Sequence, residues 1–109
     1  MSANELKIHR LRNGRAVIAL IGEHDGYSAV RIAEDLRALL EEGRDIEIDL
    51  RNTTFVDSTT VATLIEAHRH AAAQGRRVTI TLGESTGWAV RRLFELTQLD
   101  SLLPVSAKS

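Results

Sequence analysis

The chain has 109 residues, of which 14 are Lys or Arg, 15 are Asp or Glu, four are His and none is Cys. The length predicts one domain over residues 1–109, and the formal charge of −1 argues against direct nucleic-acid binding. The lack of cysteine excludes disulfides and cysteine-based zinc sites. The longest apolar run, Ala16–Ile21, is far shorter than a membrane-spanning helix, and residues 1–10 lack the apolar core of a signal peptide. We therefore expect a cytoplasmic domain without membrane insertion.

The first third of the chain predicts a β-hairpin followed by a helix. Leu6 and Ile8 indicate a first strand, Asn13-Gly14 is typical of a tight hairpin turn, and the apolar run within 15–21 predicts a central second strand. Apolar residues spaced by three and four then predict a helix over residues 28–42, with Ser28 as its N-cap.

The rest of the chain predicts alternating strands and helices. Residues 45–51 alternate apolar and charged side chains, which predicts a strand with one face in the core and the other toward water or a partner. The later elements are a connector over 52–56, a helix over 58–74, a strand over 77–82, a helix opened by residues 84–86, a packing segment over 102–105 and a loose tail over 106–109.

The order β-β-α-β-α-β-α predicts an α/β fold. The opening hairpin is antiparallel and the β-α-β units require parallel pairing, so we expect a mixed sheet of four to five strands. The outer strands alternate, which favours helices mainly on one face and a partly exposed sheet on the other. Such an open face permits a homodimer.

Small polar side chains gather at one predicted strand-to-helix junction, Thr53–Thr60. Phe55 and Val56 are expected to anchor this segment in the core, leaving residues 57–60 facing outward. Helix capping accounts for most of this pattern, because Asp, Ser and Thr satisfy the free N–H groups at a helix start. Spacing alone therefore gives only a weak functional signal, although sites do form at this edge of α/β sheets.

The whole chain resembles a STAS domain, the domain of sulphate transporters and anti-sigma-factor antagonists. Ile21–Asp25 resembles the family's Gly-Glu-Leu-Asp turn, and Ile48–Leu50 followed by Thr54–Thr59 resembles its Asp-Leu strand and Asp-Ser-Thr-Gly loop. Segments Gly75–Val78 and Val90–Asp100 resemble its fourth strand and last helix. The resemblance covers about residues 6–105, the expected core, and implies a STAS-like single domain.

This resemblance implies a binding module rather than an enzyme. By residue match, Ser58 is the phosphorylation site of an anti-sigma-factor antagonist, which binds an anti-sigma factor with serine-kinase activity and is reactivated by a phosphoserine phosphatase. The residues expected at the partner interface are Glu23, Asp25, Asp57, Ser58, Thr59 and Thr60. Within the matched motifs, two residues depart from the family pattern: His24 stands where Leu is usual, and Thr60 stands where Gly is usual.

The sequence also bears on two other function classes. A STAS-like accessory subunit in the cytoplasm, docked on a membrane transporter of the lipid ABC type, stays open as an alternative in which Ser58 needs no phosphate. A hydrolase is disfavoured, because Ser58 lacks the flanking glycines of a nucleophile elbow.

Other polar residues carry weaker signals. His68 and His70 point to different helix faces, so we expect no metal site, and no sequence motif indicates a cofactor. His68 is expected to be a hydrogen-bonded histidine at the core edge. The basic pairs 76–77 and 91–92 are typical of solvated surface, with an acidic partner or a membrane surface as the alternative for 91–92 in the last helix. Trp88 either contacts a partner or covers a helix start.

Overall fold

The computed structural model describes residues 4–97 and 105–108. Within them the chain forms strands and helices in the order β1 (Glu5–Arg10), β2 (Arg15–His24), α1 (Gly26–Glu41), β3 (Asp45–Asp49), β4 (Thr53–Val56), α2 (Ser58–Ala73), β5 (Val78–Gly83), α3 (Trp88–Thr97) and β6 (Val105–Lys108).

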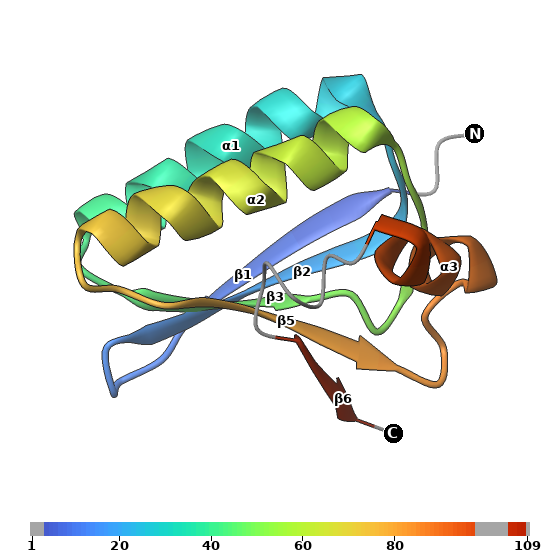
Figure 1. Ribbon diagram of the computed structural model, residues 1–109. Helices are drawn as coiled ribbons and strands as arrows, with labels where there is room; N and C mark the ends of the chain where they lie inside the picture. Colours follow the sequence, from blue (N-terminus) through green and yellow to red (C-terminus); the bar gives the residue numbers. More distant parts are fainter. Residues whose placement is uncertain (1–3, 98–104, 109) are drawn as a thin grey trace.

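The strands form one mixed sheet in the spatial order β1-β2-β3-β5-β6 (Figure 1). The hairpin partners β1 and β2 are antiparallel, whereas β2, β3, β5 and β6 run parallel to one another. The short strand β4 lies off this path and pairs in parallel with the last residues of β2, where the register shifts between Gly22 and Glu23. The mixed sheet predicted from the sequence is confirmed.

Helices α1 and α2 lie side by side across one face of the sheet, and α3 lies near the end where β5 finishes (Figure 1). Alternate residues of β2, β3 and β5 point toward α1 and α2, and Ile18, Ile48 and Ile80 among them are fully buried. From α3, Val90 and Phe94 reach the same core. None of the described helices is long and apolar enough to cross a membrane.

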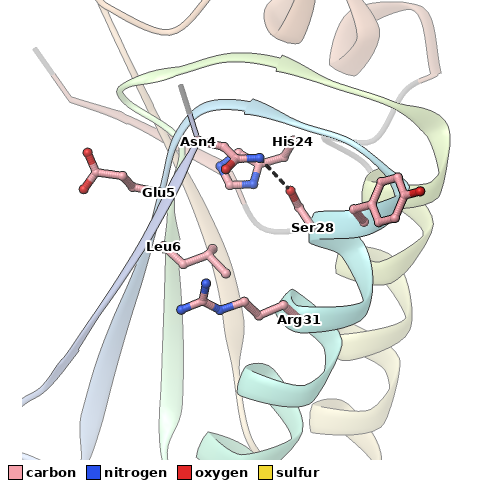
Figure 2. Close-up of a pocket in the computed structure, with 7 residues that line it drawn as sticks. Asn4, Glu5, Leu6, His24, Ser28 and Arg31 are labelled. Atoms are coloured by element: carbon pink, nitrogen blue, oxygen red, sulfur yellow. Dashed lines mark hydrogen bonds between the residues drawn. The ribbon is translucent and has the colours of Figure 1, made fainter. Parts of the chain in front are cut away.

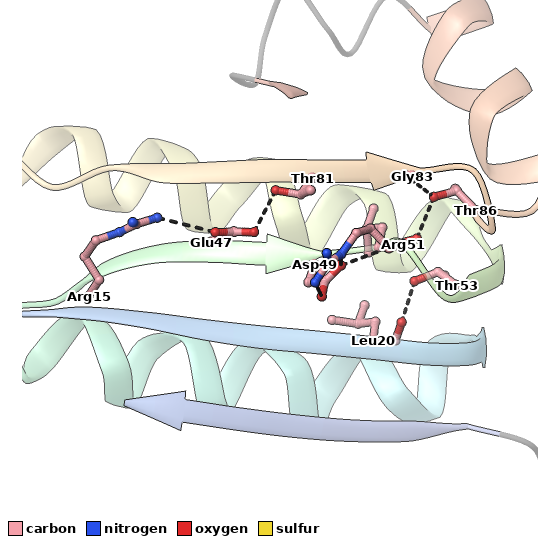
Figure 3. A network of polar contacts seen from close by, with 10 residues as sticks. Arg15, Leu20, Glu47, Asp49, Arg51, Thr53, Thr81, Gly83 and Thr86 are labelled. Carbon is pink, nitrogen blue, oxygen red and sulfur yellow. Dashed lines mark hydrogen bonds and ion pairs between the residues drawn. The ribbon is translucent and has the colours of Figure 1, made fainter. Parts of the chain in front are cut away.

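The sheet face away from α1 and α2 carries a polar network (Figure 3). Glu47 on β3 accepts hydrogen bonds from the Arg15 guanidinium, at 3.4 Å, and from the Thr81 hydroxyl, at 2.8 Å. Asp49 was expected to face water or a partner, but its side chain is buried and pairs with Arg51 through two contacts of 3.0 and 2.9 Å. The expected alternation is present, and the carboxylates of Glu47 and Asp49 on this face are paired within the molecule.

The start of α1 differs from the prediction. The helix begins at Gly26, and its N-cap is Asp25 rather than Ser28. The Asp25 carboxylate accepts hydrogen bonds from the backbone N–H groups of Tyr27 and Ser28, at 3.0 and 3.4 Å. A carboxylate three residues earlier in the chain therefore takes the capping role, because β2 continues to His24 instead of ending near Gly22.

The expected helix start at residues 84–86 is also wrong, because these residues form a turn. The Thr86 hydroxyl accepts from the Gly83 N–H and donates to the Leu50 carbonyl, both at 2.9 Å. The Gly87 N–H then bonds the Thr53 carbonyl of β4 at 2.8 Å, so the helix can begin only at Trp88.

The chain forms two strands that the sequence pattern did not predict. Residues 53–56, expected to be a connector, form β4, and residues 106–108, expected to be a loose tail, lie in β6. The packing segment predicted over 102–105 falls mostly outside the described residues, and only its last residue, Val105, is placed, at the start of β6.

Candidate functional site

Ser58 lies where β4 ends and α2 begins, at the junction that the sequence analysis singled out. It is the first residue of α2, it is exposed, and its hydroxyl has no hydrogen-bond partner in the part of the chain that the structure describes. Helices α1, α2 and α3 each follow the carboxyl end of a parallel strand, so all three begin at this end of the molecule. Ser58 therefore stands on a surface to which three helix starts contribute.

Asp57 caps α2 and is held in place by Thr60. One carboxylate oxygen of Asp57, Oδ1, accepts hydrogen bonds from the Thr60 backbone N–H at 2.8 Å and from the Thr60 hydroxyl at 2.9 Å. The backbone hydrogen bond from Thr60 is the main reason that the pKa of the Asp57 carboxyl lies below its ordinary value. The residue next to Ser58 is therefore a fixed negative charge at neutral pH.

Thr60 is fully buried, so the expectation that it faces outward is wrong. Its hydroxyl oxygen lies 3.3 Å from the His24 carbonyl and 3.4 Å from the Asp25 carbonyl, in addition to its contact with Asp57. The hydroxyl therefore lies between the start of α2 and the start of α1, and it cannot contact a partner directly. A glycine at this position would leave the space of the threonine side chain empty. It would also remove the hydroxyl donor from the two carbonyl groups and the Asp57 carboxylate.

Three carboxylates lie at the same end of the molecule as Ser58. Asp25 is exposed at the start of α1, and the Asp57 N–H donates to the His24 carbonyl at 3.2 Å, which joins the two helix starts. Glu23 is exposed on β2 opposite Phe55 of β4. The structure thus brings Glu23, Asp25, Asp57 and Ser58 to one edge, with Thr59 exposed beside them.

Exposed apolar side chains stand at the same end, and the sequence analysis missed most of them. The relative exposures are 93% for Tyr27, 62% for Val30, 43% for Phe55 and 76% for Trp88. The expectation that Phe55 anchors the segment in the core is wrong, since only Val56 points inward. For Val30 the sequence does offer a signal, because Val30 lies outside the apolar stripe of α1 and is therefore expected to be exposed. We call these four residues the apolar rim.

Packing between α3 and β4 sets the position of Trp88. A Cβ atom on Gly87 would lie 2.4 Å from the Thr54 carbonyl oxygen, so only glycine allows this approach. Trp88 follows Gly87 directly, and Phe55 follows Thr54 directly, which places both aromatic side chains on the part of the surface where α3 meets β4.

A shallow hollow lies beside the start of α1, and Tyr27 and Ser28 are among the residues that line it (Figure 2). His24 lines it and is almost completely buried. Its Nε2 atom lies 3.1 Å from the Ile21 carbonyl, whereas Nδ1 has no partner among the described residues. Burial lowers the pKa of His24 below its ordinary value, so the ring is neutral at pH 7. Ser58 does not line this hollow, which distinguishes its environment from a small-molecule pocket.

Side chains that could bind a metal ion are not clustered in the described part of the chain. No three His, Cys, Asp or Glu side chains among residues 4–97 and 105–108 are placed to hold a metal ion. The other histidine of interest, His68, is half-buried on α2 and its Nδ1 atom has no partner in the described part of the chain, so the hydrogen bond expected for it is not present at that atom. What the edge offers is an accessible hydroxyl next to fixed negative charge.

The family model described as "Mlab, STAS domain" matches residues 9–104. The chain belongs to the STAS domain family. The resemblance inferred from its motifs is therefore confirmed.

Related proteins give the same family and fold. An anti-sigma-B factor antagonist from Bacillus subtilis (strain 168) is 32% identical to this STAS domain over 92 residues, which is 84% of this chain and 82% of that protein. The crystal structure of an anti-sigma factor antagonist from Mycobacterium paratuberculosis superimposes with a TM-score of 0.80 at 22% identity, covering 96% of this chain and 89% of that one. The phosphorylated form of the Bacillus cell fate determinant SpoIIAA gives a TM-score of 0.75 at 18% identity, covering 96% and 92%.

Proposed function

We propose that this STAS domain is an anti-sigma-factor antagonist that acts in the cytoplasm and is controlled by phosphorylation of Ser58. In this proposal the unmodified protein binds an anti-sigma factor that is also a serine kinase, and the kinase releases itself by phosphorylating Ser58. A phosphoserine phosphatase restores binding. The observation that carries the proposal is the exposed Ser58 hydroxyl, free of intramolecular bonds in the described chain, at the end of the molecule where the apolar rim also lies.

The apolar rim supports binding by the unmodified form. Exposed aromatic side chains grouped on one surface are typical of protein interfaces, where Trp and Tyr often dominate the binding energy. Tyr27 and Trp88 are the most exposed of the large hydrophobic residues in the described chain, and they lie in the first turns of α1 and α3. Ser58 follows β4, which pairs with the last residues of β2 before α1 and lies against Gly87 just before α3, so we expect a partner that covers both aromatic side chains to reach Ser58.

A phosphate on Ser58 would oppose such a partner by charge. Phosphorylation adds about −1.5 to −2 charges at pH 7, next to the fixed carboxylate of Asp57 and close to Asp25. A partner that closes over this edge must remove water from the phosphate or face like charge, which costs several kcal/mol. Since each 1.4 kcal/mol changes affinity about tenfold, about 2.8 kcal/mol of repulsion weakens binding roughly 100-fold.

The same phosphate would leave the fold intact. Ser58 is the first residue of α2, and the N-terminus of a helix stabilises an exposed anion by about 0.3–1 kcal/mol. The Asp57 cap is formed with Thr60, not with Ser58, so it does not depend on the free hydroxyl. The switch therefore needs no rearrangement of the domain, because the change is confined to surface charge.

The first experiment is affinity capture from the native organism followed by mass spectrometry, using wild type, Ser58→Ala and Thr59→Ala. We expect wild type and both variants to retain an anti-sigma factor, with phosphate found on residue 58 of the wild type and of Thr59→Ala. Recovery of membrane-transporter subunits alone, with Ser58 always unmodified, would instead support the accessory-subunit alternative and overturn the proposal.

A second experiment tests the apolar rim with the recovered anti-sigma factor. Replacing Tyr27 and Trp88 by Ser should weaken binding at least tenfold, because both contribute exposed aromatic area. The matched control is Leu11→Ser, which removes an exposed apolar side chain in the β1–β2 turn. If the control weakens binding as much as the double variant, the partner does not bind at the Ser58 end.

A further inference from the structure

Arginine side chains gather at the end of the molecule opposite Ser58. The turns after β1, α1 and α2 meet there, since the Arg44 guanidinium donates to the Leu11 carbonyl at 3.2 Å and the Arg77 N–H donates to the Asp45 carboxylate at 2.9 Å. Helix α2 spans 16 residues between the two ends, a length of about 24 Å at 1.5 Å per residue. The region is therefore separate from the site proposed above.

Two of these arginines are already paired. Glu42, just after α1, lies between Arg10, at 2.9 Å, and Arg44, at 2.6 Å. These two cations lower the pKa of Glu42 to about 2. This carboxylate is thus ionised at any physiological pH and links the β1–β2 hairpin to the α1–β3 turn.

Three further arginines are exposed without a carboxylate partner. Arg12, Arg76 and Arg77 form no ion pair with any residue that the structure describes. The Arg76 guanidinium lies against the backbone of Gly43, since its terminal nitrogen is 3.1 Å from the place where a Cβ would stand there. This contact holds Arg76 beside the paired arginines. We call the five residues the arginine strip, namely Arg10, Arg12, Arg44, Arg76 and Arg77.

The composition of the arginine strip favours a protein partner with carboxylates. Its five guanidinium groups are carried by the end of β1 and by the turns after β1, α1 and α2. A planar guanidinium binds a carboxylate through two parallel hydrogen bonds, and Arg is enriched in protein interfaces whereas Lys is depleted. Leu11 stands in the same turn with 39% of its surface exposed, which adds an apolar contact.

The charge count argues against a nucleic acid as the partner. A protein that engages a duplex usually neutralises several phosphates with cations, whereas here only three arginines of the strip lack an ion pair among the described residues, and Glu41 at the end of α1, Glu42 after it and Asp45 at the start of β3 lie beside them. We propose that the arginine strip is a second interaction surface, which takes a carboxylate-rich, partly apolar segment of a protein and can be occupied while the Ser58 surface is engaged.

The test uses fluorescence anisotropy of a labelled peptide with four Asp-Glu-Leu-Gly repeats, titrated with the full chain. The variant Arg12→Glu/Arg76→Glu reverses two unpaired charges of the strip. The control Arg31→Glu/Arg92→Glu changes the net charge by the same amount at exposed arginines outside the strip, on α1 and α3. We expect the strip variant to weaken peptide binding at least tenfold and the control to stay within twofold of wild type, with thermal unfolding showing that both are folded.

Several results would overturn this proposal. Equal loss in both variants would show that binding follows net charge alone, and absence of peptide binding by wild type would show that the strip is solvated surface. Vesicles containing phosphatidylglycerol or a 20-base-pair DNA duplex, bound more tightly than the peptide, would make it a phosphate-binding surface. Ser58→Asp should leave peptide binding unchanged, so this result stands or fails independently of the phosphorylation switch.

Discussion

Replacing Thr60 by Val is the sharpest test of how the Ser58 edge is built. The two side chains have nearly the same shape, so the substitution removes the hydroxyl and leaves the packing in place. The lost contact is the 2.9 Å hydrogen bond to the Asp57 carboxylate. Hydrogen bonds to charged groups contribute about 1.5–3 kcal/mol to stability.

The expected loss lies at the lower end of that range. Asp57 is partly exposed, and it keeps the 2.8 Å hydrogen bond from the Thr60 backbone N–H. The other two acceptors near the hydroxyl also keep a donor, because the His24 carbonyl still receives the Asp57 N–H and the Asp25 carbonyl still receives the Ala29 N–H. We therefore expect Thr60→Val to lower the free energy of unfolding by about 1.5 kcal/mol.

Urea unfolding measured by circular dichroism gives this number directly. For a domain of this size the loss corresponds to a fall in Tm of roughly 6 °C, and the pKa of Asp57 should rise toward its ordinary value because a donor is lost. Thr59→Val is the matched control, since Thr59 is exposed one residue away, and it should stay within about 0.5 kcal/mol of wild type. A Thr60→Val protein as stable as wild type, or a control that loses as much, would refute the assignment of Thr60 as the link between the two helix starts.

Three further substitutions test other parts of the structure. Burial lowers the pKa of His24, so the unfolded chain takes up a proton more readily than the folded one, and the free energy of unfolding should fall as the pH drops through about 6.5. In His24→Leu the free energy of unfolding in urea should change less between about pH 7.5 and about pH 5.5 than in wild type. A pH dependence equal to that of wild type would contradict this. Glu42, with its pKa lowered to about 2 beside Arg10, contributes stability above about pH 4.3 that is lost toward pH 2, and Glu42→Gln should lack that loss in acid titrations followed by circular dichroism. Gly87→Ala places a Cβ 2.4 Å from the Thr54 carbonyl oxygen and should cost about 2 kcal/mol in urea unfolding, whereas a loss below about 0.5 kcal/mol would mean that α3 moves freely from β4.

Periodicity was sufficient to predict the long elements of this fold. The strands β2, β3 and β5 and the helices α1 and α2 each have an apolar pattern over several turns or residue pairs. The family was inferred from the resemblance of the motifs, not from periodicity. Boundaries were less predictable, because they depend on tertiary hydrogen bonds. Asp25 replaces Ser28 as the cap of α1 only because β2 continues past Gly22, and the sequence does not show how far a strand continues.

The candidate site was predicted in its chemistry but not in its burial. The junction of Asp57 and Ser58 was found from small polar residues before an apolar helix. Thr60 was expected outside because it is polar, yet the carbonyl groups at the end of β2 provide it with partners in the interior. Phe55 was expected inside because it is apolar, yet the pairing of β4 with β2 is irregular, with a register shift between Gly22 and Glu23, and only Thr53 and Val56 of β4 are buried.

The most direct test of the proposed switch compares the affinity of the recovered anti-sigma factor for the unmodified protein and for the protein carrying phosphate on Ser58, by isothermal titration calorimetry. The account predicts that phosphate weakens binding roughly 100-fold or more while the circular dichroism spectrum stays the same, since the change is one of surface charge. Affinities that agree within threefold would contradict it.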